Sequence, residues 1–177
     1  MRAVVVYESM FGNTHAVAEA VAEGIRSAVV PADVSVVPVA TAAPEMVEEA
    51  DLVVVGGPTH VHGMSRPSTR ATAPEYVRKA HGDLALDGAA TGPGVRDWFD
   101  TMGHAESHAA AFDTRMRGPA ALTGRASAGI RRSLRRHGFD VVARPESFFV
   151  DRTNHLRPGE LERARTWGST LAARLSA

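Results

Sequence analysis

Three polar side chains suited to contacts with a phosphate group lie in one short segment. Ser9, Asn13 and Thr14 supply hydroxyl and amide groups, and Gly12 permits a tight turn among them. Apolar side chains recur at helical spacing over residues 17–25, directly after this segment. Because the N–H groups at a helix start attract anions, the sequence predicts an anion site here. The alternative is ordinary helix capping, for which Ser, Asn and Thr are also preferred.

A second polar segment follows another apolar stretch. Leu52–Gly56 is wholly apolar, and residues 57–66 contain a threonine, two histidines and an arginine. We interpret this segment as one wall of a ligand site, and an uncommitted surface loop is the alternative. His60 and His62 without a third ligand nearby are a weak indication of a metal ion.

The remaining candidate groups point to no hydrolytic or metal-dependent chemistry. His104, Glu106 and His108 do not have the His-Glu-x-x-His order, and no Gly-x-Ser-x-Gly sequence is present. A basic patch at residues 131–136 contains four arginines near a helix C-terminus, where the helix dipole favours cations. A solvated face is one interpretation of this patch. Docking of an acidic partner or of a nucleotide phosphate is the other.

Strands and helices alternate along the chain and must position these segments. We predict strands at 3–7, 33–39, 52–56 and 109–113, and a fifth strand over 139–150 that bends at Pro145. We predict helices near 14–25, 44–50, 74–79, 94–102, 126–137 and 158–175. This alternation predicts an α/β fold, a three-layer αβα sandwich around a five-stranded parallel sheet. Ligands of such sheets bind beyond the carboxyl ends of the strands, so the segments at 8–14, 57–66 and 113–119 are expected to converge.

Composition is that of one ordinary globular domain over residues 1–177. No cysteine is present, so disulfides and thiolate chemistry are excluded. The first strand begins at Ala3 and no apolar run is long enough to span a membrane, so we expect a cytoplasmic protein. Residues 1–60 carry two Arg against eight acidic residues, whereas residues 61–177 carry 18 basic against 12 acidic residues. The basic residues are scattered, with few aromatic residues among them, so we expect no nucleic-acid partner.

The three polar segments together resemble the flavodoxin-like family. Ser9-Met-Phe-Gly-Asn-Thr14 is similar to that family's FMN-phosphate loop, Gly56-Gly-Pro-Thr-His60 to the turn beside the flavin ring, and Asp113-Thr-Arg-Met116 to the third ring-contacting loop. The resemblance implies strand order 2-1-3-4-5, bound FMN and electron transfer. It implies these FMN-binding residues: Ser9, Met10, Phe11, Gly12, Asn13, Thr14, Pro58, Thr59, His60, Val61, His62, Gly63, Asp113, Thr114, Arg115 and Met116.

The chain departs from the family in three respects. Family members commonly hold the flavin between aromatic side chains, often have a Tyr in the third loop and are strongly acidic. Here the second loop offers His60, Val61, His62 and Met64, the third offers Arg115 and Met116, and the chain has no net charge. Arginines 66, 70, 115 and 117 lie near the proposed ring site. Because reduction adds negative charge to a flavin, nearby cations favour it. We therefore expect a less negative midpoint potential than that of an acidic flavodoxin.

The leading hypothesis is an FMN-binding electron-transfer flavoprotein, either a carrier or a small quinone-type reductase. Its partners would be a redox protein or a small electron donor or acceptor, such as NAD(P)H or a quinone, and no side chain is assigned a catalytic role. A flavodoxin-fold binding or regulatory module that has lost FMN is the alternative. A response-regulator type receiver domain is a weaker one, since Glu8, Asp51 and Asp113 form no convincing acidic cluster.

Overall fold

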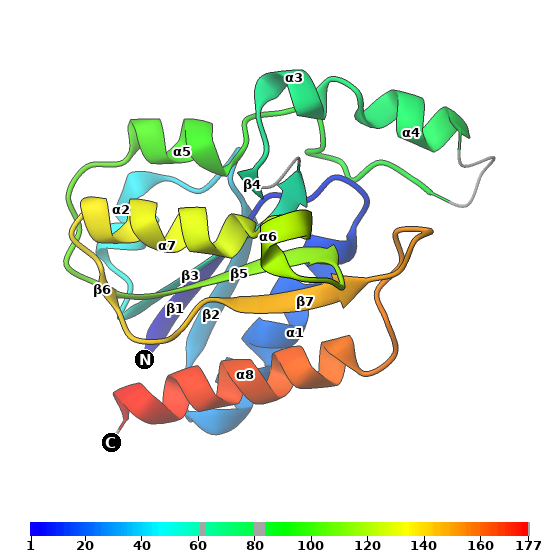
Figure 1. Ribbon diagram of the computed structural model, residues 1–177. Helices are drawn as coiled ribbons and strands as arrows, with labels where there is room; N and C mark the ends of the chain where they lie inside the picture. The colour runs from blue at the N-terminus through cyan, green and yellow to red at the C-terminus, as the bar shows by residue number, and fades with distance from the viewer. Residues whose placement is uncertain (61–62, 80–83, 177) are drawn as a thin grey trace.

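The computed structural model describes residues 1–60, 63–79 and 84–176 and shows a sheet between two layers of helices (Figure 1). The strands are β1 (Arg2–Tyr7), β2 (Asp33–Pro38), β3 (Leu52–His60), β4 (Gly63–Met64), β5 (His108–Met116), β6 (Asp140–Val141) and β7 (Glu146–Val150). The helices are α1 (Asn13–Ala28), α2 (Pro44–Glu48), α3 (Pro67–Arg70), α4 (Ala73–Lys79), α5 (Val95–Thr101), α6 (Ala120–Thr123), α7 (Ala126–Arg136) and α8 (Glu160–Leu175). The predicted αβα sandwich is confirmed.

The strand order agrees with the order that the resemblance implied. The main path through the sheet is β2-β1-β3-β5-β6, and all of these neighbours pair in parallel. Strand β7 also pairs with β5 in parallel, so β6 and β7 are two halves of the predicted fifth strand, separated at residues 142–145. Pro145 lies in that break, as expected of a residue that cannot donate a hydrogen bond to the ladder.

Successive side chains of the central strands enter two different cores. Val5, Val54 and Phe112 pack on one face of the sheet with residues of α1 and α8. Val6 and Val55 pack on the other face with residues of α2, α5 and α7. Because strand side chains alternate between faces and both faces are covered, the central strands are apolar at almost every position.

Two strands are longer than the sequence indicated. Strand β3 continues to His60, and β5 continues to Met116, so residues 113–116 lie in a strand and not in the predicted loop. The ladder from Phe112↔Glu146 to Met116↔Val150 holds this polar end of β5 in the sheet. The short helices α3 and α6 were not predicted.

Helices α1 and α8 approach each other closely at two glycines. A Cβ atom added to Gly24 would overlap the carbonyl oxygen of Arg165, and one added to Gly168 would overlap that of Val21. These clashes would be with helix backbone, which cannot turn away as a side chain can. Both glycines are therefore required by the packing of this helix pair.

We predict that Gly168→Ala lowers the free energy of unfolding by about 2 kcal/mol, because overpacking a well-packed contact typically costs about 1–3 kcal/mol. Gly103→Ala is the matched control, since nothing lies within 4 Å of an added Cβ there. Urea unfolding of both variants measures the difference. Equal stability of the Gly168→Ala variant and the wild type would contradict the packing argument.

Candidate functional site

A cavity of about 490 Å³ lies at the carboxyl ends of β1, β3 and β5. Its volume is within the range of small-molecule sites, about 300–1,000 Å³. Four separate segments line it: Met10, Phe11, Asn13 and Thr14; Pro58, Thr59 and His60; Thr114, Arg115 and Met116; and Val150, Asp151, Arg152, Thr153 and Asn154. Tyr76, Lys79 and Leu84 complete the lining. The predicted convergence of the three segments is confirmed.

A hydrogen bond within the segment after β1 stabilises its turn. Gly12 adopts a positive φ of 82°, and its N–H donates to the Ser9 hydroxyl at 3.1 Å. Ser9 itself is buried and does not line the cavity. Its hydroxyl therefore fixes the turn that leads into α1.

The start of α1 is open to the cavity. Gly12 is the residue that precedes the helix, and no side-chain hydrogen bond caps the helix there. Thr14 pairs its hydroxyl with that of Thr114 at 2.8 Å, and Asn13 donates to the Asn154 carbonyl oxygen at 2.6 Å. The side chains of Asn13 and Thr14 therefore do not cap the helix as the alternative interpretation expected. The first N–H groups of α1 retain the ability to bind an anion.

The segment after β3 contributes less of its polar surface than expected. Pro58, Thr59 and His60 line the cavity, but the Thr59 hydroxyl accepts the N–H of Ala126 at 2.9 Å. Burial lowers the pKa of the His60 imidazole below its ordinary value, which keeps the ring neutral at pH 7. Gly63 pairs with His60 in the β3–β4 hairpin and does not line the cavity. Val61 and His62 lie outside the described residues.

The third segment divides between the cavity and the start of α7. Thr114, Arg115 and Met116 line the cavity. Asp113 is fully buried, and its carboxylate accepts the N–H of Ser127 at 2.8 Å in the first turn of α7. Asp113 therefore holds a helix in place and does not line the cavity.

The sequence did not predict that the segment after β7 lines the cavity. Residues 151–154 follow β7, and Asn154 has a positive φ of 65°. The Asp151 carboxylate accepts the N–H groups of Thr153 and His155, and these hydrogen bonds lower the pKa of Asp151. Position after the fifth strand was the signal that could have found this turn, by the same rule that identified the other three segments. Tyr76 on α4 gave no such signal.

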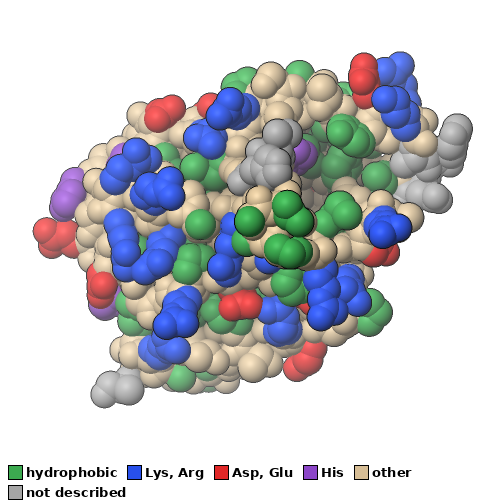
Figure 2. Space-filling model, viewed as in Figure 1, with side chains coloured by type: hydrophobic (Ala, Val, Ile, Leu, Met, Phe, Trp, Pro, Cys, Tyr) green, Lys and Arg blue, Asp and Glu red, His purple; other side chains and the backbone are tan. Residues whose placement is uncertain are grey.

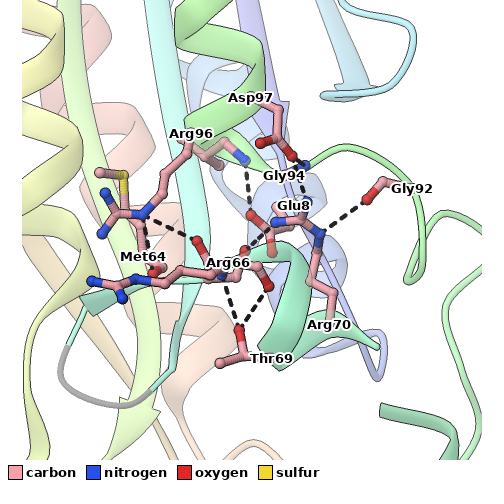
Figure 3. A network of polar contacts seen from close by, with 11 residues as sticks. Glu8, Met64, Arg66, Thr69, Arg70, Gly92, Gly94, Arg96 and Asp97 are labelled. Carbon is pink, nitrogen blue, oxygen red and sulfur yellow. Dashed lines mark hydrogen bonds and ion pairs between the residues drawn. The ribbon is translucent and has the colours of Figure 1, made fainter. Parts of the chain in front are cut away.

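A network of polar contacts, with Glu8, Ser65 and Arg70 buried in it, lies at the end of β1 (Figure 3). Arg70 is ion-paired with Asp97, and it donates to the Ser65 hydroxyl and to the Gly92 carbonyl oxygen, each at 3.0 Å. Glu8, at the end of β1, accepts the N–H of Val95 at 2.8 Å. The network joins β1 to α3 and to the start of α5 at the edge of the sheet where the cavity lies.

The network also corrects the expected set of cations. Arg70 is buried against Asp97 and does not line the cavity, and neither do Arg66 and Arg117. Among the described residues, Arg115 is the one of the four arginines expected near a flavin ring that lines the cavity. Lys79 and Arg152 add two cations that sequence reasoning did not place there.

Comparison with known proteins agrees with this geometry. Residues 5–82 match the flavodoxin family model, and this range includes the first two segments of the cavity. The structure is similar to a flavodoxin from the domain Archaea (TM-score 0.68, 21% identity, 100% of both chains) and to flavodoxin 1 of Bacillus cereus (0.65, 19%, 98% of both chains). It is also similar to a WrbA-like flavodoxin of Agrobacterium tumefaciens (0.56, 19%, 99% of this chain and 97% of that one). No curated protein shows significant similarity to the sequence.

A parallel sheet of this order, with a ligand cavity at its carboxyl edge, is the flavodoxin-like fold. The chain has the flavodoxin-like fold, and residues 5–82, which are less than half of it, match the flavodoxin family model. Across the described ranges, no group of three or more acidic or histidine side chains is placed to hold a metal ion. None of the helices in the part of the chain that the structure describes is long and apolar enough to cross a membrane.

Burial of Glu8 leads to a pH-dependent stability. Burial raises the pKa of the Glu8 carboxyl, and the hydrogen bonds from Ser65 and Val95 only partly oppose this effect. The folded protein therefore keeps a proton on Glu8 at pH values at which the unfolded chain has lost it. Its stability falls as the pH rises through that window, which begins just above the ordinary Glu pKa of about 4.3.

We predict that, relative to Glu8→Gln, the wild type loses free energy of unfolding as the pH is raised from about 4.5 toward neutrality. Urea unfolding at several pH values measures this difference, and the exposed Glu48→Gln serves as the control. Parallel pH profiles for the wild type and Glu8→Gln would show that the Glu8 pKa is not raised.

Proposed function

We propose that the cavity binds FMN and that the protein is an electron-transfer flavoprotein, acting as a carrier or as a small quinone-type reductase. The observation that carries this proposal is the uncapped start of α1 at one end of the cavity, within a segment that matches the flavodoxin family model. A monophosphate placed there would meet backbone N–H groups and the helix dipole together.

The residues present fit FMN at both ends. Asn13, Thr14 and the N–H groups of residues 10–14 would hold the phosphate, with Ser9 keeping the turn in shape. Pro58, Thr59 and His60 on one side and Thr114 to Met116 on the other would flank the ring. We include the remaining residues of these segments in the proposed site: Gly12, Val61, His62, Gly63 and Asp113, the last acting through α7.

Tyr76 supports the proposal at the ring end, where sequence analysis found no aromatic side chain. It lines the cavity and is 60% exposed, so its ring is available to a planar ligand. Phe11 lines the cavity as well. Aromatic rings provide large contact areas for planar groups, which is what an isoalloxazine ring requires.

The chemistry would come from the flavin, which exchanges electrons with a donor and an acceptor. The chain's own residues would bind and orient it and set its electrostatic surroundings. Lys79, Arg115 and Arg152 line the cavity, with Asp151 the acidic residue among the lining side chains that the structure describes. This excess of positive charge supports the expectation of a less negative midpoint potential, although with a different set of cations.

We predict that the purified protein shows flavin absorbance bands or gains them when it is incubated with FMN. A protein that stays colourless and takes up no FMN would exclude this function and favour the alternative of a module that has lost the cofactor.

We predict that Thr14→Val weakens FMN binding at least tenfold and leaves riboflavin binding nearly unchanged. Thr14 is placed at the phosphate end, and one hydrogen bond to a charged group contributes about 1.5–3 kcal/mol. Fluorescence titration with both flavins measures the difference, and Thr41→Val, in an exposed turn, is the control. Equal loss of both flavins would argue against a phosphate contact of Thr14.

We predict that Lys79→Gln combined with Arg152→Gln makes the midpoint potential of bound FMN more negative by some tens of mV, on the order expected for charges at the edge of a site. Both side chains are exposed at the cavity. Arg157→Gln, exposed and outside the lining, is the control. Dye-equilibrium titration measures the potential, and an unchanged value would contradict electrostatic tuning by these residues.

A further inference from the structure

A second cavity, of about 480 Å³, is lined mostly by arginines. We call it the arginine groove and define it by its lining: Arg125, Ala128, Arg131, Arg132, Arg135, Arg136 and Pro145. All but Arg125 and Pro145 belong to α7. Figure 2 shows Lys and Arg side chains gathered over this face of the molecule, on the left of the view. The groove shares no lining residue with the flavin cavity.

The charge of the groove is not neutralised by the protein. Among the described residues, none of its five arginines has a carboxylate within 4.0 Å, and no acidic side chain lines it. Elsewhere the chain does pair its arginines, as Arg2, Arg163 and Arg165 show. Glu146, which follows Pro145 in sequence, is ion-paired with Arg163 and so is not available to the groove.

Helix electrostatics account for only part of this arrangement. Arg135 and Arg136 lie in the last turn of α7, where the helix dipole favours cations. Arg125 precedes the first turn, where the dipole disfavours a cation. Arg131 and Arg132 stand four residues before Arg135 and Arg136, and like charges at this spacing destabilise a helix. A solvated helix face therefore does not explain the whole groove.

Arg125 is already partly fixed, and Arg131 has a buried donor without a partner. Arg125 donates to the Pro145 carbonyl oxygen at 2.7 Å and to the Ser147 hydroxyl at 3.3 Å. The Nε atom of Arg131 is buried and has no hydrogen-bond partner in the described structure. A buried donor without an acceptor is costly, and an anion in the groove would relieve that cost.

We propose that the arginine groove binds a small molecule with two or more adjacent phosphate groups, such as a nucleoside diphosphate. Guanidinium groups bind phosphate oxygens in a bidentate manner, and a terminal phosphate carries about −1.5 to −2 charges and an internal one about −1. Five arginines therefore exceed the charge of one phosphate and are closer to that of two or three. The volume and the apolar Ala128 and Pro145 leave room for a group attached to the phosphates. The proposal is independent of FMN binding.

Calorimetric titration of the purified protein with inorganic pyrophosphate at 150 mM salt tests the proposal. We expect micromolar affinity, and at least tenfold weaker binding by Arg132→Gln combined with Arg136→Gln. These two side chains are exposed, and their removal relieves a like-charge pair, so the fold is retained. Arg78→Gln combined with Arg157→Gln removes the same charge outside the groove and should change the affinity less than twofold.

Three results would overturn the proposal. One is the absence of binding heat up to 1 mM pyrophosphate, roughly the weakest affinity of a specific small-molecule site. Another is equal weakening by both double variants, which would indicate only a diffuse positive field. The third is tighter binding of a polyglutamate peptide than of pyrophosphate, lost in the Arg132/Arg136 variant, which would assign the groove to an acidic protein segment.

Discussion

The parallel ladder of β1, β3 and β5, buried on both faces, is the constraint on which the rest of the structure depends. Parallel strands require a crossover between each pair, and these crossovers are the helices that cover the two faces. Once the ladder is in register, every strand ends at the same edge. The residues after those ends are thereby brought together from positions as far apart in sequence as 10 and 154.

The same constraint makes two glycines and one polar network necessary. Helices on one face must pack closely enough to cover the sheet, and Gly24 and Gly168 permit that approach. On the opposite side, burial of Glu8 and Arg70 at the sheet edge would be costly if either were isolated. Asp97, Ser65 and backbone groups supply the partners that make this burial tolerable.

Charge is distributed in this molecule in a way that separates two anion-attracting regions. The cavity at the carboxyl edge of the sheet combines a helix start with a few cations, which suits one phosphate and a planar ring. The arginine groove lies along α7, and among the described residues no acidic side chain lines it. Arg115 of the cavity and Arg125 of the groove both donate to the Ser147 hydroxyl, so one buried side chain adjoins both regions.

The sequence by itself determined the main alternation of strands and helices, the converging edge and the turn at residues 9–14 between the first strand and the first helix. These depend on local patterns: apolar runs, helical spacing, and a glycine between a strand and a helix. Tertiary structure alone decided the rest. Residues 113–116 lie in a strand because β7 pairs with them. Arg70 does not line the cavity because it is ion-paired with Asp97, and Tyr76 lines it because α4 brings it there. Each of these outcomes depends on contacts between segments distant in sequence, which no local pattern encodes.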